Sequence, residues 1–254
     1  MDSAKPQQDG TLAALSDSSK TSGPGTTRDP STQEEPARAM LHSLSTAALK
    51  PALGALLLGW IALLGASPLL AKNLPLDQAL AERSLGRTDA PVTVHEYFSL
   101  SCSHCAAFHV NTLPKIKTDY IDTGKIRFVF HDFPLGGLAS AAAMLTRCGD
   151  PDAYHGFVDI LFKKQKQWLR SDTPIQELEG FARLAGMSPD DVMECLDNEP
   201  LFKEIENRKV GYNRDLGIKS TPTFIIGKTT VPGNLPYDDF REIFDKALKE
   251  AGAK

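Results

Sequence analysis

The sequence has few cysteines, no aromatic residue near its beginning and no run of like charge. Its 254 residues carry a net charge of −4, which indicates neither a basic surface for nucleic acid nor an acidic tail. All four cysteines follow an apolar segment, and no internal repeat or long low-complexity linker occurs after that segment. Residues 72–254 are long enough to form one sizeable hydrophobic core.

Residues 1–45 lack aromatic side chains and are rich in Ser, Thr, Pro, Gly, Asp and Gln. A segment of this composition buries too little apolar surface to offset the entropy of ordering it. We therefore predict a disordered tail. The alternative is that residues 1–39 are not translated and that Met40 is the true start, with Lys50 in a short region before the apolar run.

The next segment, Pro51–Ala71, carries no charged residue. A membrane-spanning helix takes about 20 residues, whereas a secretory signal has an apolar core of roughly 7–15 residues followed by small residues. Ala52–Leu64 fits the signal core. We predict that residues 46–71 are a signal peptide or a membrane anchor and prefer a cleaved signal; a buried core helix is the third alternative. A signal or an anchor would place residues 72–254 outside the cytoplasm, in the periplasm or its equivalent, where disulfides persist.

Two apolar stretches flank a helical one in the first half of this exported part. Pro91–Ser99 alternates β-branched and aromatic residues, which predicts a strand. A helix is expected from Ala106 to about Asp122, kinked at Pro114. Ile126–Phe133 is an almost continuous apolar run, typical of a buried strand. A strand, a helix and a strand in this order predict a βαβ unit with parallel strands.

Helical patterns fill the middle of the chain, from about residue 136 to 213, and strands return after it. Thr221-Pro222-Thr223-Phe224-Ile225-Ile226 reads as a strand that turns at Gly227-Lys228 into a hairpin. A last helix is expected from Pro236. The predicted order is β-α-β, a helical insertion and β-β-α, which is an α/β architecture.

A Cys-x-x-Cys motif, Cys102-Ser103-His104-Cys105, directly follows the first strand and opens the helix. Unpaired backbone N–H groups and the helix dipole favour a thiolate at the first sulfur, and the pKa in such sites falls to roughly 3.5–7.5. A protonated His104 would add positive charge. The alternative is a zinc site of Cys102, His104 and Cys105 with Cys148 or Cys195 as the fourth ligand, but zinc pairs usually occupy a knuckle turn and no second Cys-x-x-Cys is present.

Three stretches of the chain resemble the DsbA-like family of thioredoxin-fold oxidoreductases. They are residues 86–96 leading into the Cys-x-x-Cys motif, residues 124–135, and Leu216-Gly217-Ile218-Lys219-Ser220-Thr221-Pro222-Thr223-Phe224. The resemblance implies a thioredoxin fold with an inserted helical domain. It also implies exchange chemistry at Cys102 and Cys105 with no cofactor and no metal.

The resemblance assigns further residues to the site. It implies that Pro222 is a cis proline lying against Cys102, and that the backbone of Thr221 pairs with substrate. It also matches Glu96 to a buried acid that handles the proton of Cys105. The alternatives are an ordinary trans proline at a strand start and an exposed strand residue at position 96.

As a function, the resemblance implies the introduction of disulfides into unfolded or newly exported cysteine-containing polypeptides. A membrane quinone-linked oxidase would reoxidise the enzyme, and no nucleic acid is involved. Ser103 and Thr221 stand where the best-known oxidases have Pro and often Val, so a reductase or isomerase is an alternative. A peptide-binding chaperone with incidental cysteines is another.

Cys148 and Cys195 each lie on the apolar face of a predicted helix in the insertion. We predict a structural disulfide between them; two buried free thiols are the alternative. The histidines His95, His109, His131 and His155 show no ligand-like spacing and are interpreted as surface or core residues.

Overall fold

The computed structural model describes residues 74–253. The predicted disordered tail of residues 1–45, its alternative start at Met40 and the predicted signal or anchor of residues 46–71 lie outside the described residues. None of the helices in residues 74–253 has the length and apolar character needed to cross a membrane.

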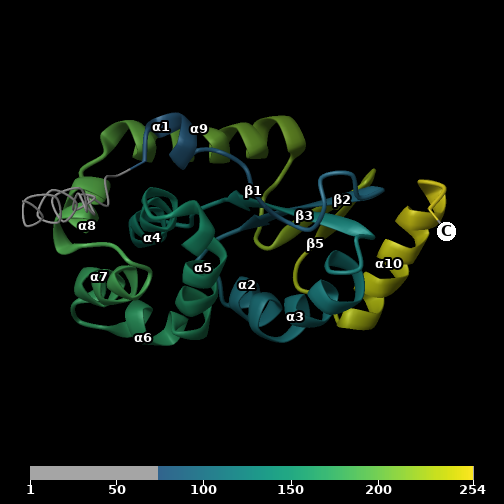
Figure 1. Ribbon diagram of the computed structural model, residues 1–254, viewed down its shortest axis with the longest axis horizontal. Helices are drawn as coiled ribbons and strands as arrows, with labels where there is room; N and C mark the ends of the chain where they lie inside the picture. The colour runs from purple at the N-terminus through teal and green to yellow at the C-terminus, as the bar shows by residue number, and fades with distance from the viewer. Residues whose placement is uncertain (1–73, 254) are drawn as a thin grey trace, which may run out of the picture. The chain divides into compact units, whose positions relative to one another are not determined.

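A five-stranded mixed sheet forms the centre of this part of the chain, in the order β1-β3-β2-β4-β5 (Figure 1). β2 and β3 run parallel, and the other neighbouring strands are antiparallel. Neither of the two central strands, β2 and β3, has an exposed residue, because helices cover both sides of the sheet. The strands are β1 (Arg83–Leu85), β2 (Val92–Phe98), β3 (Ile126–Asp132), β4 (Thr223–Ile226) and β5 (Thr229–Pro232).

The connection from β2 to β3 is helical throughout but changes its winding. It consists of α2 (Ser103–Ala107), a π-helical turn η1 (Phe108–Thr112), α3 (Leu113–Ile116) and a second π-helical turn η2 (Lys117–Ile121). Pro114 at the start of α3 cannot donate an i to i−4 hydrogen bond, and η1 is the wider turn that precedes it. The predicted single helix with a kink at Pro114 is therefore a chain of α and π turns.

The insertion between β3 and β4 consists of helices. They are α4 (Gly137–Cys148), a 3₁₀ turn η3 (Pro151–Ala153), α5 (Tyr154–Lys163), α6 (Gln165–Arg170), α7 (Pro174–Leu184), α8 (Pro189–Leu196) and α9 (Glu199–Leu216). The chain between α5 and α6 breaks at Lys164, whose backbone leaves the helical region. With α10 (Tyr237–Glu250) after β5, the order of elements confirms the predicted thioredoxin fold with an inserted helical domain.

Two elements at the start of the described part were not predicted. α1 (Leu76–Ala79) and β1 are too short to show a helical or alternating pattern. β1 is an edge strand that ends at Gly86, where φ is +89° and an added Cβ would lie 2.6 Å from the Ile126 carbonyl oxygen. Only glycine fits this close approach, which fixes the position of β1 beside β3.

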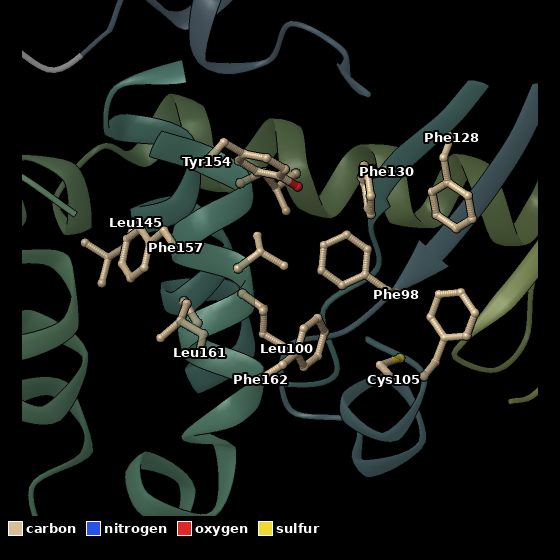
Figure 2. Close-up of a cluster of buried hydrophobic side chains, with 14 of the residues drawn as sticks. Phe98, Leu100, Cys105, Phe128, Phe130, Leu145, Tyr154, Phe157, Leu161 and Phe162 are labelled. Atoms are coloured by element: carbon tan, nitrogen blue, oxygen red, sulfur yellow. The ribbon is translucent and has the colours of Figure 1, made fainter. Parts of the chain in front are cut away.

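The hydrophobic core runs from the sheet into the insertion. Phe98 and Leu100 from β2 and its following loop meet Phe162 of α5, and Cys105 lies beside them (Figure 2). The opposite face of β2 carries Tyr97, which contacts Tyr212 of α9. Alternate residues of β2 thus face two different helical layers, and the layer containing α2 and α5 is the one that surrounds Cys105.

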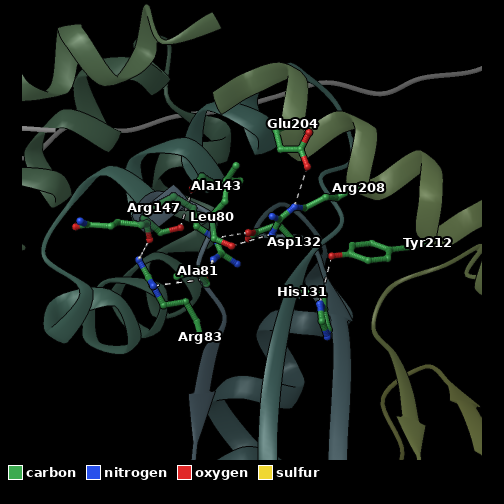
Figure 3. Close-up of polar contacts among 12 residues, drawn as sticks. Leu80, Ala81, Arg83, His131, Asp132, Ala143, Arg147, Glu204, Arg208 and Tyr212 are labelled. Atoms are coloured by element: carbon green, nitrogen blue, oxygen red, sulfur yellow. Dashed lines mark hydrogen bonds and ion pairs between the residues drawn. The ribbon is translucent and has the colours of Figure 1, made fainter. Parts of the chain in front are cut away.

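A polar network ties the segment before β1 to β3 and the insertion (Figure 3). Arg147 donates to Asp132 at 2.7 Å and to the Ala81 carbonyl at 2.8 Å, and Arg208 donates to the Leu80 carbonyl at 2.9 Å. A cavity of about 260 Å³ opens beside these residues and is lined by neither Cys102 nor Cys105. The network therefore holds the layers together away from the Cys-x-x-Cys motif.

Candidate active site

The first cysteine of the motif is placed by the junction between β2 and α2. Cys102 adopts an extended backbone (φ −82°, ψ 122°) as the residue that caps α2, and its N–H donates to the Ser99 carbonyl at 3.0 Å. The side chain is partly exposed and is a free thiol. A strand that ends where a helix begins thus presents this sulfur at the surface, with the first N–H groups of the helix around it.

The surroundings of Cys102 favour its thiolate. Its pKa is lowered from 9.0 to about 5, mainly by the hydrogen bond from the Cys105 thiol. Partial burial raises the pKa, and the Thr221 side chain and the backbone N–H groups of Cys105 and His104 lower it further. Cys102 is therefore mostly ionised near neutral pH, and its sulfur is both a nucleophile and a good leaving group.

The second cysteine has the opposite properties. Cys105 has no exposed surface. Burial raises the pKa of its thiol far above 9.0, and the hydrogen bond to Cys102 and the charge of Glu96 raise it further. The two thiols of one motif thus differ in protonation: Cys102 releases its proton to solvent, whereas Cys105 keeps its own and must exchange it inside the protein.

The Thr221–Pro222 peptide bond is cis, and this loop lies against the first cysteine. Cys102 Sγ lies 3.2 Å from the Thr221 carbonyl oxygen, a contact across 119 positions of sequence. Thr221 is 8% exposed. The loop that leads into β4 and the start of α2 thus lie next to each other at the Cys102 sulfur.

The two residues between the cysteines lie beside Cys102 at the start of α2. Ser103 and His104 have exposed side chains on the first turn of α2. The N–H of His104 helps to lower the pKa of Cys102. The added positive charge of a protonated His104 stays a prediction.

Glu96 lies beneath the motif and has a partner that the sequence did not indicate. Its carboxylate has no exposed surface, which excludes the alternative of an exposed strand residue. His109 Nε2 contacts both of its oxygens, at 3.0 and 3.1 Å. The interpretation of His109 as an ordinary core residue was incomplete. An i, i+4 spacing between Cys105 and His109 was the available signal, since it places both side chains on one helix face.

Comparisons with known proteins agree with this geometry. A family model for thioredoxin matches residues 78–246. Over 173 residues the chain is 31% identical to disulfide bond formation protein D of Bacillus subtilis, a match that covers 65% of this chain and 76% of that protein. The chain belongs to the DsbA-like branch of the thioredoxin family.

Solved structures of this family are also similar. The crystal structure of alpha-DsbA1 from Wolbachia pipientis has a TM-score of 0.64 and 31% identity, covering 68% of this chain and 93% of that one. Oxidised BdbD from Bacillus subtilis has a TM-score of 0.58 and 28% identity, covering 70% and 97%. A relative in Rickettsia felis is 33% identical over 172 residues, which are 67% of this chain. The chain spans only 61% of that relative's length.

A residue of the insertion reaches the DsbA-like motif. Gln165, at the start of α6, is 5% exposed. Its amide nitrogen donates to the carbonyls of Leu100 at 2.7 Å and Cys102 at 2.9 Å. The helix break at Lys164 is what turns Gln165 toward this loop. No local sequence pattern indicated this contact, because it joins residues 63 and 65 positions apart.

The other two cysteines are bonded to each other. Cys148, at the end of α4, and Cys195, on α8, form a disulfide with a Cα–Cα distance of 6.0 Å. Both are buried within the insertion. The zinc alternative needed one of these two sulfurs as a free fourth ligand, and the disulfide removes both.

Proposed function

We propose that this DsbA-like chain is a thiol–disulfide oxidoreductase that introduces disulfides into unfolded or newly exported polypeptides. The observation that carries the proposal is the opposed protonation of the two cysteines, with the pKa of Cys102 near 5 and that of buried Cys105 raised. A stable Cys102 thiolate favours the reduced enzyme. The disulfide form is therefore a strong acceptor of electrons from other thiols.

The exchange proceeds in two steps. A substrate thiolate attacks Cys102 Sγ, and the bond between the two cysteine sulfurs breaks with its electron pair leaving on Cys105 Sγ. A second substrate thiolate then attacks the substrate sulfur of the mixed disulfide, and Cys102 leaves as its stabilised thiolate. The substrate is oxidised by two electrons and the enzyme is reduced by two.

The roles of the other site residues follow from their positions. Cis Pro222 holds the Thr221 backbone against Cys102, so an extended substrate can pair with that backbone while its thiolate approaches the sulfur. Ser103 and His104 are exposed beside Cys102 and offer contacts to the substrate chain. Glu96 exchanges the proton of Cys105, and the disulfide between Cys148 and Cys195 is structural.

The location and the reoxidising partner belong to the same proposal. We assign the activity to the periplasm or another compartment outside the cytoplasm, with residues 46–71 as the export signal or anchor. A membrane quinone-linked oxidase is the proposed acceptor of electrons from reduced Cys102 and Cys105.

A refolding assay tests the direction of electron flow. The oxidised protein is mixed with a reduced, unfolded polypeptide that gains activity only when its disulfides form. Stoichiometric gain of substrate disulfides, lost in Cys102→Ser, supports the proposal. Reduction of preformed disulfides without oxidation of thiols would favour a reductase, and equal refolding by Cys102→Ser would favour a chaperone.

A further inference from the structure

The proposed exchange assigns a role to Glu96 but none to His109, with which Glu96 forms a buried pair. Glu96 comes from β2 and His109 from η1, and Nε2 lies 3.0 and 3.1 Å from the two carboxylate oxygens. The Glu96 side chain is 0% exposed and the His109 side chain is 5% exposed. Glu96 is sealed from solvent, and the small exposed surface of the pair belongs to His109.

The helix places this pair beside the buried thiol. Cys105 and His109 are spaced i, i+4, so both side chains project from one face of the α2–η1 segment toward β2. The charge of Glu96 acts on Cys105 strongly enough to raise its pKa. Cys105, Glu96 and His109 therefore form one buried cluster, and only His109 retains any exposed surface.

Apolar rings enclose the pair and leave few other groups that could exchange its proton. The imidazole of His109 packs against Phe98, Phe130 and Phe162, with ring centroids 5.6, 5.9 and 4.2 Å away. Figure 2 shows these three rings and Cys105 in the same part of the hydrophobic core. Two further titratable groups whose charges interact with the pair are Tyr154 and His155, both from α5. Burial raises the pKa of Tyr154 and lowers that of His155, so neither carries a charge near neutral pH.

We propose that His109 is a positioning residue that shares one exchangeable proton with Glu96 and connects that carboxylate to solvent. This role rests on the proposed function, because it matters only if Cys105 gains and loses a proton during turnover. When the disulfide is reduced, Cys105 Sγ leaves as a thiolate and takes one proton from the pair, which regains it from solvent at the imidazole. When the disulfide closes, the pair accepts the proton of the Cys105 thiol before its sulfur attacks Cys102.

Oxidation of the reduced protein by glutathione disulfide proceeds in two successive steps, the first at Cys102 and the second at Cys105. In the first step the Cys102 thiolate attacks glutathione disulfide, which releases one glutathione thiolate and leaves a mixed disulfide. In the second step Cys105 loses its proton and attacks Cys102 Sγ, which releases the second glutathione. Rapid acid quenching followed by intact-mass measurement gives the rate of each step in one experiment.

His109→Gln is the principal variant, because it retains an N–H donor to Glu96 but cannot carry the proton. We expect the second step to slow by about tenfold or more near pH 7, with accumulation of the glutathionylated protein and an unchanged first step. Glu96→Gln should slow the same step, and the double variant should be no slower than the slower single one, since the residues act as a unit. His95→Gln, the same change on the other face of β2, is the matched control and should leave both rates unchanged.

A second step in His109→Gln within twofold of the unaltered protein would overturn the role of His109. If that variant does not fold, His109→Phe with Glu96→Gln retains the ring packing and leaves no buried charge, and the same slowing is expected. An unaltered protein that never closes the Cys102–Cys105 disulfide would overturn the proposed function itself. The two failures are thus distinguishable.

Discussion

The two cysteine pairs of this chain lie in opposite surroundings. Cys102 is partly exposed at a strand–helix junction, with backbone N–H groups around its sulfur and a pKa near 5. Cys148 and Cys195 are 5% and 0% exposed and join two helices of the insertion. The comparison shows that the surroundings of a cysteine determine its reactivity. The environment of Cys102 favours thiol–disulfide exchange, whereas the buried disulfide between Cys148 and Cys195 is structural.

The largest expected effect is on substrate oxidation and comes from replacing the cysteines of each pair in turn. Cys102→Ser removes the nucleophile, so oxidation of a reduced polypeptide should fall to background. Cys148→Ala with Cys195→Ala should retain most of the activity, because this disulfide joins α4 to α8 within the insertion and neither sulfur belongs to the Cys-x-x-Cys motif. Initial rates of substrate oxidation measure both. A double variant as inactive as Cys102→Ser would contradict the division between the pairs.

The second effect is on stability and concerns the disulfide between Cys148 and Cys195. The disulfide spans 47 positions of sequence, and removing such a loop closure costs about 4 kcal/mol on the chain-entropy model. Urea unfolding of the Cys148→Ala, Cys195→Ala variant, measured with Cys102 and Cys105 reduced, should show this loss in the free energy of unfolding. A change below about 1 kcal/mol would mean that helix packing alone holds α4 to α8.

A third effect should appear where the insertion meets the motif. Gln165→Leu leaves the Leu100 carbonyl without its donor, whereas the Cys102 carbonyl still accepts from the Ala106 N–H at 3.0 Å. We expect a loss of about 1–3 kcal/mol in the free energy of unfolding. Gln167→Leu is the control, since Gln167 donates only to exposed Glu177. Equal stabilities for the two variants would show that Gln165 does not support the loop.

The smallest effect is a pH dependence of the reduced protein, because solvent screens the partly exposed Cys102. Its pKa in the folded protein is below 9.0, so its stabilisation is complete above pH 9 and is lost as pH falls through about 5. The urea midpoint of the reduced protein should therefore exceed that of the oxidised protein at pH 7. The difference should grow toward pH 9 and shrink toward pH 5. A difference of the opposite sign at pH 7 would contradict the thiolate argument.

Local patterns predicted much of the fold and of the site. The strand before Cys102, the apolar run of β3 and the Thr221-Pro222 strand start are short continuous signals, and each was read from its own residues. The pairing of Cys148 with Cys195 was predicted because each lies on the apolar face of a helix.

Long-range geometry explains what was missed. His109 meets Glu96 only because η1 folds over β2, and neither residue alone indicates a pair. Gln165 reaches the motif because the helix breaks at Lys164, and no proline or glycine in the sequence marks that break. The part played by the backbone N–H of His104 in lowering the pKa of Cys102 depends on the start of α2, which a single residue does not reveal.

The redox potential of the Cys102–Cys105 pair as a function of pH tests the account most directly. Equilibration of residues 72–254 with glutathione buffers should give roughly −120 to −180 mV at pH 7. Between pH 5 and 8 only Cys105 gains a proton on reduction, so the potential should fall by about 30 mV per pH unit, and below pH 5 by about 59 mV. A value near roughly −270 mV, with about 59 mV per pH unit up to pH 8, would show an ordinary Cys102 thiol and contradict the account.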